Sequence, residues 1–141
     1  MEGFKTTAVI KMPQVNLDKT WSKSSTATFK RMLTLSRQRG VDKAGTALQQ
    51  ALYRSLESNS WIWPGSTLRV NGTTVSSPRN IYDTGSLYAS QRLKISHQVT
   101  QSKLTITYDS PYANLVHYGG AIRPYGNKNA NTVLVPARPW F

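Results

Sequence analysis

Two neighbouring stretches of the chain, residues 93–99 and 104–108, alternate strictly between apolar and polar positions. The positions of the expected inner face are Leu93, Ile95, His97 and Val99 in the first stretch and Leu104, Ile106 and Tyr108 in the second. A period of two is the pattern of half-buried strands. Because the polar residues 100–103 between the stretches suit a short loop, the pattern predicts a β-hairpin.

The middle of the chain has helical spacing instead. Apolar or small residues recur at intervals of four, three, four and four residues in the series Val41, Gly45, Leu48, Leu52 and Leu56. This stripe predicts a helix over residues 42–58 that packs on a sheet. A separate helix is predicted over residues 25–39, and Gly40 is expected to end it. Its expected apolar side carries Phe29, Met32, Leu33 and Ser36, and the other side carries Lys30, Arg31 and Arg37.

Strand-forming stretches flank the helical part. Residues 7–12 predict a strand that ends at Pro13, because proline cannot donate to a strand ladder. Residues 15–25 are polar with Trp21 embedded, which is typical of a flexible connection. Residues 68–75 predict a hairpin around Asn71 and Gly72, a favoured two-residue turn. A last apolar run, residues 133–135, ends at Pro136.

Two short helices are expected in the second half of the chain. Asp83 or Thr84 offers a side-chain oxygen that can cap the first of them. The second is predicted over residues 111–118, with Ser110 as its cap and Pro111 at its first position, where a missing N–H costs nothing. Gly119 can take the left-handed conformation that ends a helix.

These elements predict an α+β fold, with a small antiparallel sheet packed against one main helix and with additional short helices and extended loops. A single domain is expected over residues 1–141. Within it, residues 1–24 form a strand plus a flexible connection, and residues 25–58 form the helical part. Residues 61–141 form hairpins, short helices and a C-terminal extended segment.

Composition narrows the class of protein. The chain has 141 residues and no cysteine, which excludes disulfide bonds and thiolate metal sites. No apolar run approaches the ~18 residues that a membrane-spanning helix needs, so no membrane association is expected. Glu2 and the absence of a following apolar core argue against a signal peptide.

Charge is the most unusual property of the composition. Eighteen lysines and arginines against six acidic residues give a formal net charge of +12. Such an excess indicates a polyanionic partner, since neutralising phosphates provides affinity that does not depend on sequence. Acidic protein partners are the alternative. The basic residues are spread along the chain, with only a modest cluster over residues 30–31 and 37–39, so sequence-specific DNA reading is not expected.

No constellation for catalysis is evident. The two histidines, His97 and His117, are interpreted as structural, and no third group supports an acid–base pair of the ribonuclease kind. The six carboxylates are scattered, and no metal-ligand spacing occurs. Gly119 and Gly120 follow a predicted helix, whereas phosphate-cradling loops precede one. We therefore predict no enzyme activity, no cofactor and no metal, and expect a binding or structural protein.

Three short motifs follow one another in residues 81–141. They are Asp-Thr-Gly-x-Leu (Asp83, Thr84, Gly85, Leu87), Pro-Tyr-Ala-x-x-x-His-x-Gly (Pro111, Tyr112, Ala113, His117, Gly119) and Pro-Ala-Arg-Pro-Trp-Phe (Pro136, Ala137, Arg138, Pro139, Trp140, Phe141). In this order and at these separations the motifs resemble the virion morphogenesis or tail-completion proteins of tailed bacteriophages.

The resemblance implies a structural virion protein, assembled in the host cytoplasm into a ring at the head–tail junction. A hexamer is expected, and a dodecamer if the subunit lies nearer the portal. The implied partners are further copies of the chain, adjacent head-completion or connector proteins and tail-tube proteins, with non-specific contact to packaged DNA. The alternative is a small basic nucleic-acid-binding protein.

Several aromatic and basic residues are candidates for a subunit interface. Trp61 and Trp63 lie in an irregular stretch, where they serve either a core or an interface. Arg123 and Tyr125 belong to a polar loop, residues 123–131, which is interpreted either as a loop that orders on contact or as a solvated loop. The terminal aromatic pair, residues 140–141, either closes the domain's own core or docks on a neighbour.

Overall fold

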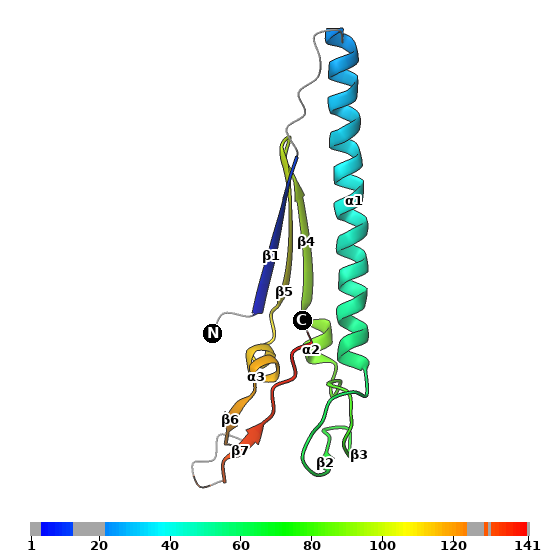
Figure 1. Cartoon of the computed structure of the whole chain (residues 1–141). Coiled ribbons are helices and arrows are strands. Elements are labelled where there is room, and N and C mark those ends of the chain that lie inside the picture. The colour runs from blue at the N-terminus through cyan, green and yellow to red at the C-terminus, as the bar shows by residue number, and fades with distance from the viewer. Residues whose placement is uncertain (1–3, 13–21, 124–128, 130, 141) are drawn as a thin grey trace. The chain divides into compact units, whose positions relative to one another are not determined.

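The computed structural model describes residues 4–12, 22–123, 129 and 131–140. It is an α+β chain, as predicted (Figure 1). The elements in order are β1 Phe4–Lys11, α1 Lys23–Glu57, β2 Thr67–Leu68, β3 Thr74–Val75, α2 Ser86–Ala89, β4 Gln91–His97, β5 Gln101–Tyr108, α3 Ala113–Tyr118, β6 Gly120–Ile122 and β7 Val133–Val135.

The chain divides into two compact units. The hairpin unit comprises Thr6–Gln49 and Leu93–Ile106, and the motif unit comprises Met1–Lys5, Gln50–Arg92 and Thr107–Phe141. Helix α1 and strands β1, β4 and β5 contribute residues to both. Each unit buries its own apolar residues, among them Val41, Leu104 and Ile106 in the hairpin unit and Leu52, Leu56, Tyr108, Ala113, Val135 and Trp140 in the motif unit.

In the hairpin unit, α1 packs on a three-stranded sheet of order β1-β5-β4. A Cβ atom added at Gly45 would lie 2.8 Å from the Cδ1 atoms of both Ile95 and Leu104. The helix therefore lies so close to these two strands that a side chain at this position would have to displace the ends of both side chains, and the predicted packing of a helix on the hairpin is confirmed. The hairpin loop comprises residues 98–100 instead of the predicted 100–103, because β4 ends at His97 and β5 begins at Gln101. Val99, predicted on the inner face, therefore lies in the loop and is 81% exposed.

The two predicted helices are one helix, so the expected break at Gly40 is wrong. A glycine inside a helix costs about 1 kcal/mol relative to alanine but keeps its N–H donor, so it weakens a helix without ending it. A Cβ atom at Gly40 would meet nothing within 4 Å, so no contact with another element requires a glycine there. The predicted end of the helix, at residue 58, agrees closely with the observed end at Glu57.

The buried stripe of α1 also differs from the predicted one. Met32 and Leu48 are 61% and 40% exposed, whereas Arg37, predicted on the other side, is half-buried. Steps of four residues advance about 400° around a helix with 3.6 residues per turn, so Leu33, Arg37, Val41 and Gly45 share one face.

The motif unit contains the hairpin predicted around Asn71 and Gly72. Strands β2 and β3 pair antiparallel, with Thr67 opposite Val75. Five residues, 69–73, connect the strands instead of the predicted two: the N–H of Arg69 donates to the carbonyl of Thr73 and the N–H of Gly72 to that of Arg69, each over 2.9 Å, and Gly72 adopts φ 81°. The Asn71 side chain accepts the N–H of Thr73 at 3.0 Å and thereby stabilises the turn.

Both short helices exist, with shifted starts. Helix α2 has Gly85 as its N-cap residue, so the predicted caps lie outside the cap position. The Thr84 hydroxyl still accepts the N–H of Ser86 at 3.3 Å, while Asp83 is exposed. Helix α3 begins at Ala113, because residues 111–112 form a turn before it, and its predicted end at Gly119 is confirmed with φ 73°.

The last strand, β7, has a partner that the sequence pattern does not show. It pairs antiparallel with β6, with Gly120 opposite Val135 and Ile122 opposite Val133. Strand β6 was missed because it has three residues and starts with a glycine, which is typical of turns rather than strands. The flexible connection predicted for residues 15–25, including Trp21, falls largely on residues 13–21, outside the described part of the chain.

Candidate functional site

The candidate site lies in the motif unit, where the second and third motif segments meet. Gly119, at the end of α3, lies against the backbone after β7: an added Cβ atom would be 2.7 Å from the carbonyl oxygen of Val135 and 2.7 Å from the amide nitrogen of Ala137. The N–H of Arg138 donates to the carbonyl of Val116 over 3.0 Å. These contacts hold the Pro-Ala-Arg-Pro segment alongside α3.

Trp140 completes this packing. It is 4% exposed, and its ring lies edge-on to Tyr108, with centroids 5.5 Å apart, and to His117, at 5.0 Å. Of the two alternatives for the aromatic end of the chain, the one in which Trp140 closes the core of its own unit is confirmed. Phe141 lies outside the described residues.

The first motif segment leads from the end of α1 into α2. The N–H of Ile81 donates to the carbonyl of Leu56 over 2.9 Å. Gly85 adopts φ 78°, and an added Cβ atom would lie 2.8 Å from the Tyr82 hydroxyl oxygen. In α2, Leu87 is half-buried, and the ring of Tyr88 stacks on Tyr53 with centroids 4.1 Å apart.

Two buried arginines share one aromatic partner in this unit. Arg79 is 9% exposed and Arg138 is 8% exposed. Their guanidinium carbons lie 4.1 and 4.9 Å from the centroid of the Trp63 ring, within the range of cation–π attraction. The backbone of Arg79 pairs with that of Trp61 in an isolated β-bridge. Trp63 thus stabilises the arginines within its own unit, which is a role beyond the core-or-interface alternatives of the sequence.

Burial and repulsion make both arginines weaker bases than usual. Burial, and to a smaller extent the nearby charge of Arg79, lower the pKa of Arg138 to about 10. Burial also lowers the pKa of Arg79, with repulsion from Arg69 adding to the effect and attraction to Asp83 opposing it. Both groups nevertheless stay protonated at neutral pH, so the unit holds two buried positive charges close together.

A cavity of about 510 Å³ opens beside these arginines. All three motif segments contribute to its lining through residues 83–87, Tyr112 and Arg138, together with Arg69 and Arg79. Hydroxyl groups of Thr84, Ser86, Ser110 and the tyrosines add hydrogen-bonding capacity. The structure therefore brings the motif segments together around a concave, positively charged surface.

The remaining candidates do not join this cavity. Trp61 is half-buried, and its indole N–H donates to the carbonyl of Ser55 over 3.1 Å. Arg123 is exposed, and Tyr125 is outside the described residues. The other motif residues, Pro111, Ala113, Pro136 and Pro139, do not line the cavity either.

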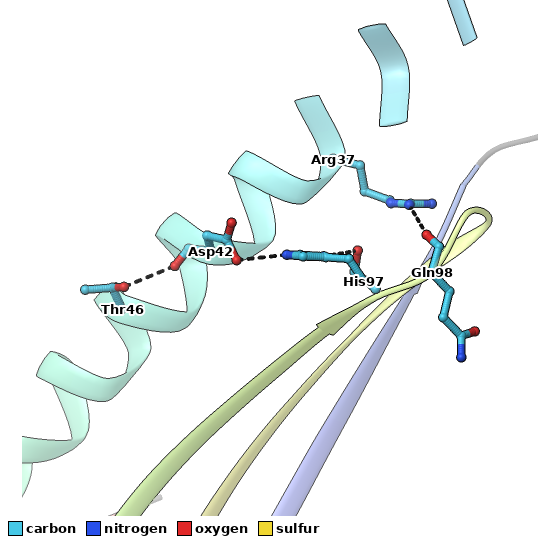
Figure 2. A network of polar contacts seen from close by, with 6 residues as sticks. Arg37, Asp42, Thr46, His97 and Gln98 are labelled. Atoms are coloured by element: carbon cyan, nitrogen blue, oxygen red, sulfur yellow. Dashed lines mark hydrogen bonds and ion pairs between the residues drawn. The ribbon is translucent and has the colours of Figure 1, made fainter. Parts of the chain in front are cut away.

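A second polar cluster occurs in the hairpin unit (Figure 2). His97 Nε2 lies 3.0 Å from Asp42 Oδ1, and His97 Nδ1 lies 2.8 Å from Ser102 Oγ. Arg37 donates to the carbonyl of Gln98 over 2.7 Å and to that of Val99 over 3.2 Å. These bonds tie the tip of the β4–β5 hairpin to α1, so the interpretation of His97 as a structural residue agrees with its contacts.

Sequence reasoning missed the role of Arg79 and Arg69. Arg79 follows Pro78 in a stretch without clear periodicity, and nothing in its local sequence distinguishes it from a solvated arginine. The nearby pair of tryptophans was the available signal, because arginine stacks readily on indole rings.

Among the described residues, no group of histidines and carboxylates could hold a metal ion. No helix of the described chain has the length and apolarity to cross a membrane. Comparison with models of known protein families, with curated proteins and with solved structures finds no match.

Proposed function

We propose that this chain is a structural subunit of a tailed bacteriophage, a neck or tail-completion protein that forms a ring and joins the head to the tail. The observation that carries the proposal is that the second and third motif segments pack together through Gly119, Arg138 and Trp140, and that the first segment lines the same cavity. The motif residues stabilise the packing of the unit and so fix the shape of its surface, as expected of a structural protein.

Exposed apolar side chains in the motif unit favour assembly. Ile62 is 77% exposed, Leu68 69%, Val70 81% and Leu134 73%. Single exposed apolar residues are ordinary, but several on irregular segments and edge strands of one small unit are typical of a surface that another protein covers. We expect contacts between subunits to use these residues.

The proposed ring forms through head-to-tail contacts between identical subunits, which close when the rotation per subunit divides the circle. We propose a hexamer, with a dodecamer as the alternative nearer the portal. The adjacent head-completion or connector proteins and the tail-tube proteins would stack on its two faces.

A small basic nucleic-acid-binding protein is the second candidate, and the charge of the hairpin unit favours it. Among the described residues of this unit, Asp42 is the only carboxylate, and it pairs with His97. The basic residues described there are Lys11, Lys23, Lys30, Arg31, Arg37, Arg39, Lys43, Lys94 and Lys103. Such an excess would attract phosphates without sequence preference. In the proposed virion role, the same unit would contact packaged DNA.

Electron microscopy of lysates from a phage genome lacking this gene tests the proposal. Filled heads separated from complete tails are expected, with tailed particles restored by complementation. Intact tailed particles without the gene would refute the joining role. The purified protein's affinity for DNA at rising salt then tests the second candidate, which requires tight binding that weakens steeply.

A further inference from the structure

The motif unit contains positive charge that its own carboxylates do not neutralise. Among the described residues, the ion pairs join Arg92 to Asp109 and His97 to Asp42, so neither involves Arg79 or Arg138. The Nε atom of Arg138 is buried without a hydrogen-bond partner. Asp83 attracts Arg79 but is itself exposed. Both guanidinium groups contact the Trp63 ring but form no ion pair with a described carboxylate, and buried charges are costly unless they are paired, so this arrangement favours the binding of an anion.

The cavity beside them has the size and chemistry to hold one. Its volume of about 510 Å³ lies within the roughly 300–1,000 Å³ of ordinary ligand sites. Arg69, Arg79 and Arg138 line it together. Arg69 is oriented by bonds to the backbone and side-chain oxygens of Asn80, so its guanidinium group is already held in place. Planar guanidinium groups match the two oxygens of a carboxylate.

We propose that this cavity binds a carboxylate side chain of an acidic peptide segment that belongs to an assembly partner. The two most buried arginines, Arg79 and Arg138, are only 9% and 8% exposed, which a single side chain can reach more readily than the backbone of a nucleic-acid duplex. Apolar and aromatic side chains, Val70 and Tyr112, lie at the same cavity and are 81% and 64% exposed. A cavity with both charged and apolar lining residues suits a peptide, because a peptide can present acidic and apolar side chains together.

The chain's own composition argues against a second copy as the occupant. It has only six acidic residues against eighteen basic ones, so an acidic partner fits its charge better than another molecule of this protein does. That the peptide comes from an assembly partner rests on the proposed function, whereas the binding of a carboxylate by the cavity does not.

Fluorescence anisotropy with a labelled, N-acetylated hexaglutamate peptide tests the cavity, with hexaglutamine as the uncharged control. Arg79→Gln and Arg138→Gln are expected to weaken hexaglutamate binding by roughly tenfold or more, because each removes a charged donor. Arg54→Gln is the matched control: Arg54 is exposed in the same unit and its loss changes the net charge equally. Binding within about twofold of the unmodified protein is expected for it.

Equal weakening by Arg54→Gln and Arg138→Gln would overturn the proposal, because it would indicate diffuse attraction. Undetectable binding of hexaglutamate would overturn it as well. A short single-stranded oligonucleotide that displaces the peptide, and that loses affinity in Arg138→Gln as much as the peptide does, would replace the acidic peptide by a phosphate ligand. Inorganic phosphate that displaces the peptide equally well would replace the acidic peptide by a small anion as the ligand.

A rim variant covers the case in which an arginine variant fails to fold. Val70→Glu changes a side chain that is 81% exposed, and it places a carboxylate at the cavity. It is expected to compete with the peptide and weaken its binding at least severalfold, with an unchanged melting temperature. Unchanged binding in this variant would contradict the assigned site.

Complementation separates this inference from the proposed function. If the Arg138→Gln variant binds no hexaglutamate and leaves heads and tails unjoined, both the carboxylate site and the joining role are supported. Normal tailed particles with Arg138→Gln would overturn the assembly partner as occupant while the joining role stands. Normal tailed particles without the gene, combined with arginine-dependent peptide binding, would refute the joining role but not the carboxylate site.

Discussion

The ring of Trp140 lies edge-on against the ring of Tyr108, with centroids 5.5 Å apart, and both side chains are almost fully buried. The last described residue of the chain is thus part of the core of the motif unit. We expect Trp140→Ala to lower the free energy of unfolding by about 3–5 kcal/mol, the range for removing a large buried ring. Leu134→Ala, at a side chain that is 73% exposed, is the control and should change it by less than about 0.5 kcal/mol. Urea unfolding measures both, and equal effects would contradict the assigned role of Trp140.

Gly119→Ala is expected to destabilise the motif unit more than its backbone conformation alone requires. Gly119 has φ 73°, and an added Cβ atom would lie 2.7 Å from backbone atoms of the segment after β7. Gly65→Ala separates the two causes, because Gly65 has φ 75° and nothing within 4 Å. Gly65→Ala should lower the free energy of unfolding by about 1–2 kcal/mol, because alanine is strained at a positive φ. Gly119→Ala should lower it clearly more. Similar losses in thermal unfolding would show that the close approach is relaxed easily.

Two glycines of α1 are expected to respond in opposite directions. Gly45→Ala should destabilise the hairpin unit, because its Cβ atom would meet Ile95 and Leu104 at 2.8 Å. Gly40→Ala should stabilise it by about 0.5–1 kcal/mol, since Gly40 is helical with open space around it. Circular dichroism during urea unfolding measures both changes. Destabilisation by Gly40→Ala would indicate a contact or a helix break at this position.

His117 is expected to make the motif unit less stable in mild acid. Burial lowers its pKa below the ordinary value of 6.5, so the folded chain takes up this proton at lower pH than the unfolded chain does. Stability from this group is therefore complete above pH 6.5 and is lost as the pH falls from there through the lowered folded pKa. His117→Gln should flatten this part of the urea-midpoint profile. An unchanged profile in the variant would assign the acid sensitivity to other groups.

An element of the fold can be predicted from the sequence when the contacts that determine it are local. The alternation of Leu93, Ile95 and His97 correctly predicts a strand, because the period of a strand is set by its own backbone. Gly119 correctly marks a helix end for the same reason. The continuous α1 was missed because a glycine inside a helix is a small local cost, which neighbouring packing outweighs.

The candidate cavity depends on contacts that are distant in sequence. Arg138 belongs to a motif, but its partners Arg79 and Trp63 come from segments with no distinct pattern. Arg37 shows the same limit: its place on the inner face of α1 follows from its bonds to the Gln98 and Val99 carbonyls. An arginine that is buried and one that is solvated have the same sequence signature, so only the fold distinguishes them.

Strand β1 has a consequence for how the protein behaves at high concentration. It is the outer strand of its sheet, and Val9 and Ile10 on it are 49% and 41% exposed. An open edge of this kind favours aggregation through strand pairing. In an antiparallel pair of two β1 strands centred on Ala8, Lys5 of each copy would face Lys11 of the other. Like charges in opposing positions disfavour that pairing, so these lysines should keep the protein soluble at low ionic strength and protect it less as salt screens them.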